Sequence, residues 1–539
     1  MKKLALCIPL VVLLVGCMFS AQPTPTIEPA LTVTPTETAA AAMPVATSTA
    51  TPVAKAASTA TPIVDAASTA TPAAADPLWD WADLSPYKQA MLPDFVADVD
   101  RMADVTRYVI DLHVNPAAAS FRGRERVRYT NQESVRLDEI VFRLLPQTPG
   151  YGGQMQVEAV EVAGKPVSFH LDFQDSAVYV PLPTALEPGG QVELALDFSG
   201  TLNTDSSTGY SQYGYFNGVL TMPNAYPMIP VYDDEGWNVE LAPTYGDATF
   251  ADSALYLAHV TLPADWVVVS SGVIVERVDN GDGTATHTCA SGLMRDFMLV
   301  ASADYGQVDA QVGPVLVTSY YLPGDEKGGK LALDYTVHAL RIYEQLFGPY
   351  PFTELDVAAT PTSAGGIEYP GLFVIAERLY GQTGGFFEIV AVHEAAHQWW
   401  YSMVGSDQLD EPWLDEALTQ YSSLLYIEHR YGPERAQVFL KENFVSWYQS
   451  IDAQAQEMVI GLPVAAYPEY LYGPIVYGKG PLFFHELRLQ LGDEMFYEVL
   501  RTYLDQYRYG VAYPQDFVRI AEQVGGRELD ALYQEWVGE

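Results

Sequence analysis

Residues 385–404, GFFEIVAVHEAAHQWWYSMV, are predicted to form a helix that carries two histidines and a glutamate. His393 and His397 are four residues apart, so on a helix both imidazoles lie on one face and can reach a single ion. Glu394 lies close to the same face, where it can hold an attacking water molecule. Imidazole nitrogens and carboxylate oxygens suit Zn²⁺, which needs three protein ligands and one open position for catalysis. The stretch therefore predicts part of a catalytic zinc site.

Glu416 is the predicted third ligand. It lies in the segment WLDEA at 413–417, which opens another predicted helix, and eighteen residues separate His397 from Glu416. A helix packed beside the first can aim this carboxylate at the same ion. The chain has only nine histidines in 539 residues, so a chance His-Glu-x-x-His would arise in about one such chain in a hundred. In the alternative interpretation, the two histidines only pack in the interior or face water. That interpretation gives Glu416 no role.

The second half of the chain is predicted to be rich in helices. Apolar residues in 329–347 recur near helical spacing, and the stretch ends at Gly348. Pro412, Gly432 and Pro433 stand where helix ends are expected. Further helical stretches are predicted at 385–404, 412–431, 433–449, 475–491, 493–507 and 527–537.

Residues 84–310 are predicted to form a mostly antiparallel β domain. Tyr108, Ile110, Leu112 and Val114 alternate with the residues between them, and similar alternation recurs at 192–198. Gly, Pro and Asn-Gly turns separate these runs at short intervals. The predicted fold class is therefore multidomain α+β, with this β domain followed by a mainly helical domain at 311–539.

The first seventeen residues are predicted to be a signal peptide. Lys2 and Lys3 precede an apolar run, 4–15, that is too short to span a membrane. The sequence LVGC at 14–17 resembles the lipobox of bacterial lipoproteins. This resemblance implies cleavage before Cys17 and a lipid on that residue, hence an extracytoplasmic protein anchored to the bacterial membrane. An ordinary secretory signal, which would give a secreted protein, is the alternative.

Residues 18–83 are predicted to be a disordered linker rich in Thr, Pro and Ala. Its unit Ser-Thr-Ala-Thr-Pro recurs at Ser48, Ser58 and Ser68. A segment without a sufficient apolar core cannot offset the loss of chain entropy on folding. It would act as a stalk or a passive spacer, with glycosylation an open question.

The composition excludes some partners. The net charge is −40 and no basic patch stands out, so nucleic acid is not an expected partner. Strong acidity favours solubility and mildly favours cationic substrates. After removal of Cys7 and lipidation of Cys17, Cys289 would have no disulfide partner. Any metal site must therefore use His and carboxylate ligands.

Three motifs occur in the order that is typical of one enzyme family. Besides the zinc motif, GGIEYP at 365–370 resembles a Gly-x-Met-Glu-Asn motif, and YGKG at 477–480 resembles Tyr-x-Lys-Gly. With them, residues from about 310 to 539 resemble the thermolysin-like catalytic domain of the aminopeptidase N and leukotriene hydrolase family, which are zinc gluzincins. The β region resembles the family's N-terminal saddle more weakly, through its strand pattern and Arg295-Asp296-Phe297.

The resemblance implies a role for each motif residue. One zinc ion would be the cofactor, and Glu394 would act as general base and then acid. Tyr477 would donate to the developing oxyanion. Glu368 would accept the substrate's α-ammonium, while the backbone at Gly365 and Gly366 would pair with an extended peptide. The implied function is a metallopeptidase that releases N-terminal residues from extracytoplasmic peptides.

Several departures from the family pattern leave alternatives open. Tyr369 stands where relatives have Asn, and Ser423 stands where they commonly have a supporting Glu. No second ammonium-binding residue is evident near 224–233, and no segment corresponds to the helical domain that covers the site in many relatives. A zinc endopeptidase with an open cleft and an inactive, anchored peptide-binding protein are the alternatives. Epoxide hydrolysis has no supporting residue.

Overall fold

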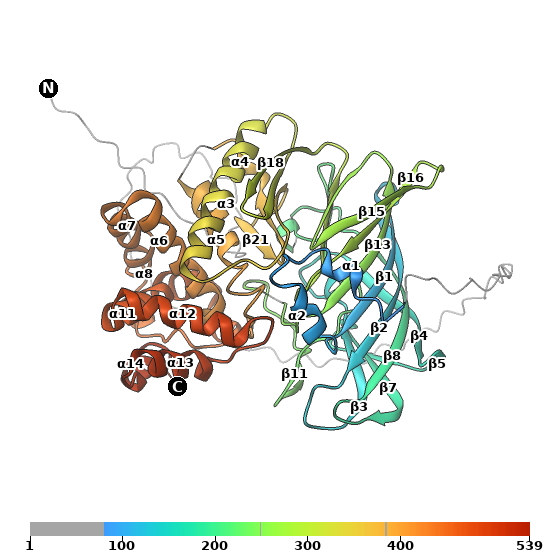
Figure 1. Ribbon diagram of the computed structural model, residues 1–539, viewed down its shortest axis with the longest axis horizontal. Coiled ribbons are helices and arrows are strands. Elements are labelled where there is room, and N and C mark those ends of the chain that lie inside the picture. The colour runs from blue at the N-terminus through green and yellow to red at the C-terminus, as the bar shows by residue number, and fades with distance from the viewer. Residues whose placement is uncertain (1–79, 208, 248, 383–384, 539) are drawn as a thin grey trace, which may run out of the picture. The chain divides into compact units, whose positions relative to one another are not determined.

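The computed structural model describes residues 80–207, 209–247, 249–382 and 385–538. The predicted signal peptide with Cys17, and the linker up to residue 79, lie outside these residues, so those predictions remain predictions. The described residues form a β-rich half followed by a half that holds most of the helices (Figure 1). The predicted α+β fold class is confirmed. Among the described helices, none has both the length and the apolar character that crossing a bilayer requires.

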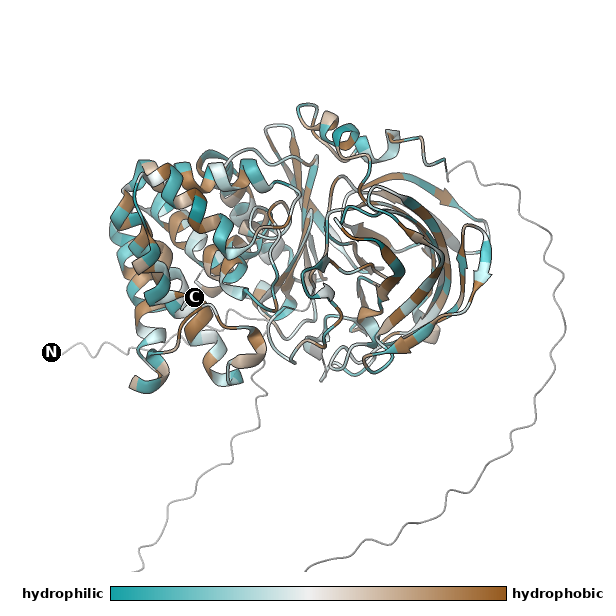
Figure 2. Cartoon of the chain, turned by 90° about the horizontal axis from the view of Figure 1, so that it is seen from below, coloured by the Kyte–Doolittle hydropathy of each residue, from teal (hydrophilic) through white to brown (hydrophobic). Residues whose placement is uncertain are grey.

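The largest sheet of the β-rich half contains eight strands: β1 Arg107–Asn115, β2 Ser120–Thr130, β4 Gln154–Val162, β5 Lys165–Val167, β8 Gln191–Thr201, β13 Leu255–Pro263, β15 Val273–Asp279 and β16 Thr284–Ala290. Their order is β15-β16-β13-β1-β2-β8-β4-β5. β1 runs parallel to β13, and the other neighbouring pairs are antiparallel. Figure 2 shows that this sheet is strongly curved.

The core of the β-rich half lies against the curved sheet. The alternating side chains Tyr108, Ile110, Leu112 and Val114 of β1 all belong to this core, as their spacing predicts. Two smaller sheets contribute to the same core. Their strands, with a separate two-stranded hairpin, are β3 Leu137–Arg143, β6 His170–Asp172, β7 Ala177–Leu186, β9 Gly214–Phe216, β10 Val219–Pro223, β14 Val267–Ser270, β17 Met298–Ser302, β11 Tyr232–Asp233 and β12 Gly236–Trp237.

A five-stranded sheet begins the second half. Its strands, in spatial order, are β18 Gly306–Val312, β19 Val315–Tyr321, β20 Glu354–Thr360, β22 Leu372–Ala376 and β21 Gly366–Tyr369. The predicted boundary between residues 310 and 311 lies inside β18, which pairs with β19. β21 is the edge strand and runs antiparallel to β22, so one side of its backbone is available for pairing.

Helices pack on this sheet and continue to the C-terminus (Figure 1). The main ones are α3 Glu326–Leu346, α5 Phe386–Ala396, α6 Leu418–Tyr431, α7 Pro433–Phe439, α11 Gly480–Leu491, α12 Asp493–Tyr507, α13 Pro514–Gly525 and α14 Asp530–Trp536. Short helices are α1 Ser85–Lys88, α2 Val96–Arg101, α4 Glu377–Tyr380, α8 Ser446–Tyr448, α9 Ala453–Gln456 and α10 Glu469–Tyr472. Every predicted helical stretch overlaps a helix of the structure. The helix α13 was not predicted, although Pro514 at its start and Gly526 at its end are typical of helix boundaries.

The prediction of one helix over 385–404 is wrong in its second part, because α5 ends at Ala396. Tertiary contacts replace the helical pattern beyond that point. The Gln398 amide donates to the Tyr369 carbonyl at 2.9 Å and accepts from the Gly371 N–H at 2.8 Å. The Trp399 indole donates to the Gly348 carbonyl at 3.0 Å. The Gln398 bonds tie the end of α5 to the turn that follows β21, and the Trp399 bond ties it to the loop that follows α3.

Arg295 joins the two halves. This buried side chain of the β-rich half donates to the carbonyls of Tyr401 at 2.6 Å and Met403 at 3.3 Å, and also to that of Gly510. The same guanidinium donates to the Ala251 carbonyl of its own half at 3.0 Å. Loops of the β-rich half are thereby held against the segment that follows α5.

Candidate active site

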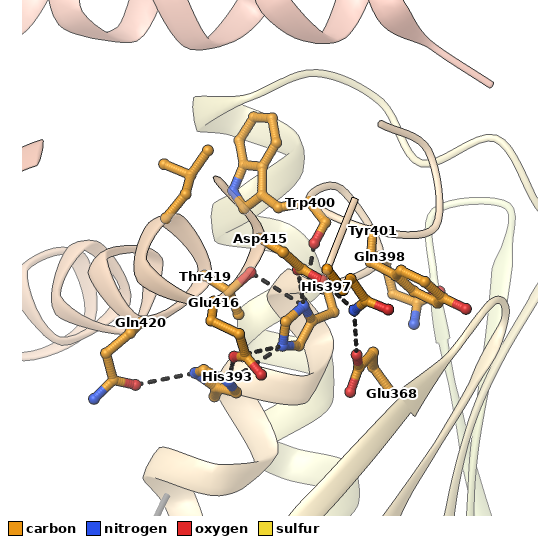
Figure 3. Close-up of polar contacts among 12 residues, drawn as sticks. Glu368, His393, His397, Gln398, Trp400, Tyr401, Asp415, Glu416, Thr419 and Gln420 are labelled. Carbon is orange, nitrogen blue, oxygen red and sulfur yellow. Dashed lines mark hydrogen bonds and ion pairs between the residues drawn. The ribbon is translucent and has the colours of Figure 1, made fainter. Parts of the chain in front are cut away.

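The two histidines and Glu416 converge on one point (Figure 3). The His393 and His397 Nε2 atoms are 3.2 Å apart. Glu416 Oε2 lies 3.2 Å from the first and 3.5 Å from the second of these nitrogens. All three side chains are buried. The structure thus brings together the three residues that the sequence predicts as metal ligands.

The opposite nitrogen of each imidazole faces an oxygen. His393 Nδ1 lies 3.0 Å from Gln420 Oε1, and His397 Nδ1 lies 2.7 Å from Asp415 Oδ1. These acceptors favour a proton on Nδ1, so the Nε2 lone pairs point at each other and at the Glu416 carboxylate. Lone pairs and a carboxylate at such distances repel one another unless a cation lies among them.

A tetrahedral zinc ion fits this donor set. With bonds of about 2.0–2.1 Å, two ligands of such an ion are about 3.3–3.4 Å apart. The observed separations of 3.2, 3.2 and 3.5 Å match that spacing. Among the described residues, Glu368, His397 and Asp415 form a second possible group. There, however, the 2.7 Å contact between His397 Nδ1 and Asp415 Oδ1 is an ion pair that orients the imidazole.

A π-helical turn places the two acidic neighbours. The turn spans Trp413–Ala417 and leads directly into α6. Within it, Asp415 contacts His397 Nδ1 while Glu416 faces His397 Nε2. Two consecutive residues therefore contact the two nitrogens of the same imidazole. π-Helical turns are frequent at functional sites.

Glu394 lies buried against the backbone of Gly366. A Cβ at Gly366 would lie 2.5 Å from Glu394 Cγ and Oε1, so no other residue fits beside this carboxylate without displacing it. Burial raises the pKa of Glu394 well above its usual value, and the nearby Glu368 raises it further. The Gly365 carbonyl accepts from the Ala376 N–H at 2.9 Å, so this group is already paired within the sheet.

Glu368 points from the edge strand β21 toward the same centre (Figure 3). Its Oε1 accepts a hydrogen bond of 3.3 Å from the Gln408 amide, which also donates to Asp415. Burial raises the pKa of Glu368 to about 8, although the charge of His397 opposes this rise. A cation placed beside Glu368 would return the carboxyl to its ionised form.

Tyr477 lies in a second π-helical turn, Gly473–Lys479, which continues into α11. Its buried hydroxyl donates to Glu416 Oε1, the oxygen of the ligand carboxylate that does not face the histidines. The hydroxyl is therefore at the metal centre and needs only a change of acceptor to serve a substrate oxygen.

One cavity contains the reactive groups and is lined by both halves. The second half contributes the three predicted zinc ligands, Glu394, Tyr477 and the strand from Gly366 to Tyr369. The β-rich half contributes loop residues, among them Tyr151, Asp247 and Asp296. Burial raises the pKa of the Asp247 carboxyl, and the charges of Glu368 and Glu416 raise it further. Asp247 therefore lies close to both of these glutamates. A further acidic residue thus lines the cavity, outside the region 224–233 where the sequence shows no evident ammonium-binding residue.

Residues 331–536 match the family profile described as "Peptidase family M1 domain". This chain carries a peptidase family M1 domain. The resemblance to the aminopeptidase N family, inferred from three motifs, is thereby confirmed.

Known proteins show the same likeness. Aminopeptidase M1-C and aminopeptidase M1-A of Oryza sativa subsp. japonica are 27% and 24% identical to this chain over 382 and 476 residues. These matches cover 68% and 83% of this chain but 42% and 51% of the relatives, so the chain spans about half the length of the curated relatives it matches. A solved M1 zinc metallopeptidase of Deinococcus radiodurans, at 22% identity, has the same fold with a TM-score of 0.63, covering 81% of this chain and 94% of that chain.

Some residues that support the predicted ligands of the M1 domain were not predicted from the sequence. Ser423, seven residues beyond Glu416, stands where relatives commonly have a supporting Glu. The structure places Gln420 beside His393 instead. Gln420 is one helical turn from Glu416, so helical spacing could have indicated it. Asp415 could have been indicated by its position next to the predicted ligand Glu416. The contact of Gln408 with Glu368 joins distant residues, and no sequence pattern indicates it.

Replacing Asp415 by Asn is expected to weaken Zn²⁺ binding by about 10- to 100-fold, because a neutral amide orients the His397 imidazole less firmly than a carboxylate does. Competition with a chromogenic chelator measures the affinity. Asp410→Asn, which changes an exposed carboxylate just before this π-helical turn, is the matched control. Equal affinities for both variants would show that Asp415 does not support the ligand.

Proposed function

We propose that this protein is a zinc aminopeptidase that hydrolyses the first peptide bond of peptides with a free N-terminus. The observation that carries the proposal is that Glu368 shares a buried cavity with the three ligands and with Glu394. An acidic side chain beside a hydrolytic centre can hold a terminal ammonium group. The names of the rice relatives, which are aminopeptidases, support the same activity.

His393, His397 and Glu416 would hold the zinc ion. When bound, zinc supplies a Lewis acid that polarises the scissile carbonyl and makes water more acidic. Glu394 removes a proton from the attacking water and delivers it to the leaving amine. Its burial and the neighbouring Glu368 raise its pKa, which makes it a stronger base than an exposed carboxylate.

The substrate would enter along β21. Its backbone pairs with the free edge of this strand as an added strand. Glu368 and Asp247 bind the α-ammonium, which limits how much chain can precede the scissile bond. The Tyr477 hydroxyl turns from Glu416 to the substrate oxygen as negative charge develops there.

Two matched peptides test the proposal. One has a free N-terminus and its twin is acetylated, and mass spectrometry identifies the products with and without a zinc chelator. Stepwise loss of first residues from the free peptide alone, stopped by the chelator, is the expected result. Internal cleavage of both peptides would indicate a zinc endopeptidase, and no cleavage with added zinc would indicate a binding protein.

We also propose that lipid on Cys17 anchors the protein outside the cytoplasm. The order of Lys2 and Lys3, an apolar run and then Cys17 supports this. A fatty-acid analogue fed to the producing cells is expected to label the full chain but not Cys17→Ser. An unlabelled wild-type chain recovered from the medium would favour secretion instead.

A further inference from the structure

One carboxylate in the cavity is not used by the mechanism above. Asp296 lies on the loop between β16 and β17, is 1% exposed and lines the cavity. Its Oδ2 atom accepts a hydrogen bond of 2.6 Å from the Tyr401 hydroxyl. Its Oδ1 atom has no hydrogen-bond partner among the described residues. A buried acceptor without a donor is costly, so the site is suited to a ligand that brings one.

The adjacent cation does not fill this need. Arg295 directs its hydrogen bonds to the carbonyls of Tyr401, Ala251, Met403 and Gly510. Its charge lowers the pKa of Asp296, but burial is the larger influence and raises that pKa to about 7. Arg295 therefore holds the two halves together and does not donate to Asp296 Oδ1.

Asp296 and Glu368 mark two different places in the cavity. The charges of His397, Asp415 and Glu416 all shift the pKa of Glu368, so this carboxyl lies beside the predicted zinc ligands. The groups that lower the pKa of Asp296 are Tyr401 and Asn224, through hydrogen bonds, and Arg295, through its charge; none of these is a predicted zinc ligand. Burial raises the pKa of Tyr401, and both Asp296 and Glu368 raise it further, so this tyrosine lies near both carboxylates.

We propose that Asp296 binds the cationic side chain of the substrate's first residue, so that peptides beginning with Lys or Arg are preferred. The inference rests on the proposed aminopeptidase activity, in which Glu368 holds the α-ammonium of that residue. The described lining contains five carboxylates and neither Lys nor Arg, so a substrate with two positive charges meets no repulsion from a lysine or arginine. A neutral aliphatic side chain would leave the buried Asp296 Oδ1 without a donor, and sites built around such a bond discriminate strongly.

The test compares kcat/KM for two peptides that differ only in having Lys or norleucine first. The full chain is expected to prefer Lys by about tenfold or more, and Asp296→Asn is expected to lower the Lys-to-norleucine ratio at least about tenfold. Asp252→Asn is the matched control. The charge of Asp252, like that of Asp296, raises the pKa of Arg295, but Asp252 does not line the cavity. Its ratio should equal that of the wild type.

The outcomes separate this inference from the proposed function. If the wild type cuts neither peptide with zinc present, the proposed function fails. If it cuts both equally, or if Asp296→Asn keeps the wild-type ratio, only the role of Asp296 fails. Should Asp296→Asn not fold, calorimetry with Glu394→Gln protein provides a second measurement. Lysine amide is then expected to bind at least about tenfold more tightly than norleucine amide, and equal binding overturns the inference.

Discussion

Replacing Glu394 by Gln is expected to lower kcat for peptide hydrolysis by about 10²- to 10⁴-fold, while zinc content stays near one ion per chain. The amide cannot take a proton from water, although its shape matches that of the carboxyl packed against Gly366. The ligands His393, His397 and Glu416 are unchanged, so metal binding should persist. Steady-state kinetics and elemental analysis of the same preparation measure both quantities.

Glu388→Gln is the matched control for this substitution. Glu388 lies on the same helix, α5, but accepts hydrogen bonds from Tyr426 at 2.8 Å and Tyr431 at 2.6 Å, and it does not line the cavity. An amide oxygen can still accept both bonds, so activity should stay within a few-fold of the wild type. Near-normal activity of Glu394→Gln with zinc bound would contradict the proposed role of Glu394.

The part of the site that depends on local geometry could be predicted from the sequence. His393, Glu394 and His397 share one helix, so their spacing alone indicates that they act together. Glu416, Glu368 and Tyr477 are far from these residues along the chain. Glu416 was predicted because its segment opens the next helix, whereas Glu368 and Tyr477 were included through the family motifs, and the structure places all three in the same cavity.

The rest could not be predicted because it depends on contacts between distant segments. α5 ends at Ala396 because Gln398 and Trp399 bond to residues of other elements, while the apolar pattern continues unbroken to residue 404. Similarly, the bond between Tyr401 and Asp296 joins residues that are 105 positions apart. Sequence periodicity describes one element at a time and carries no information on which loops of the β-rich half reach the site.

Replacing Glu368 by Ala is expected to remove the advantage of a free N-terminus. The carboxylate is buried, so in wild type it would form a charge pair with the α-ammonium away from bulk water. Truncating one partner of such a pair costs about 2–5 kcal/mol, which corresponds to a fall in kcat/KM of roughly 30- to 5000-fold. The acetylated twin has no ammonium, so its slow cleavage should not fall in parallel.

The ratio of kcat/KM for free and acetylated peptides is therefore the decisive quantity. Glu368→Gln provides a second variant of nearly the same shape, whose amide oxygen can still accept from Gln408 but carries no charge. If charge is what holds the substrate, Gln and Ala should lower the ratio to a similar extent. If Gln restores the wild-type ratio, Glu368 shapes the cavity rather than binding the ammonium. Equal losses for both peptides would instead point to a disturbed zinc site, since Glu368 lies beside His397.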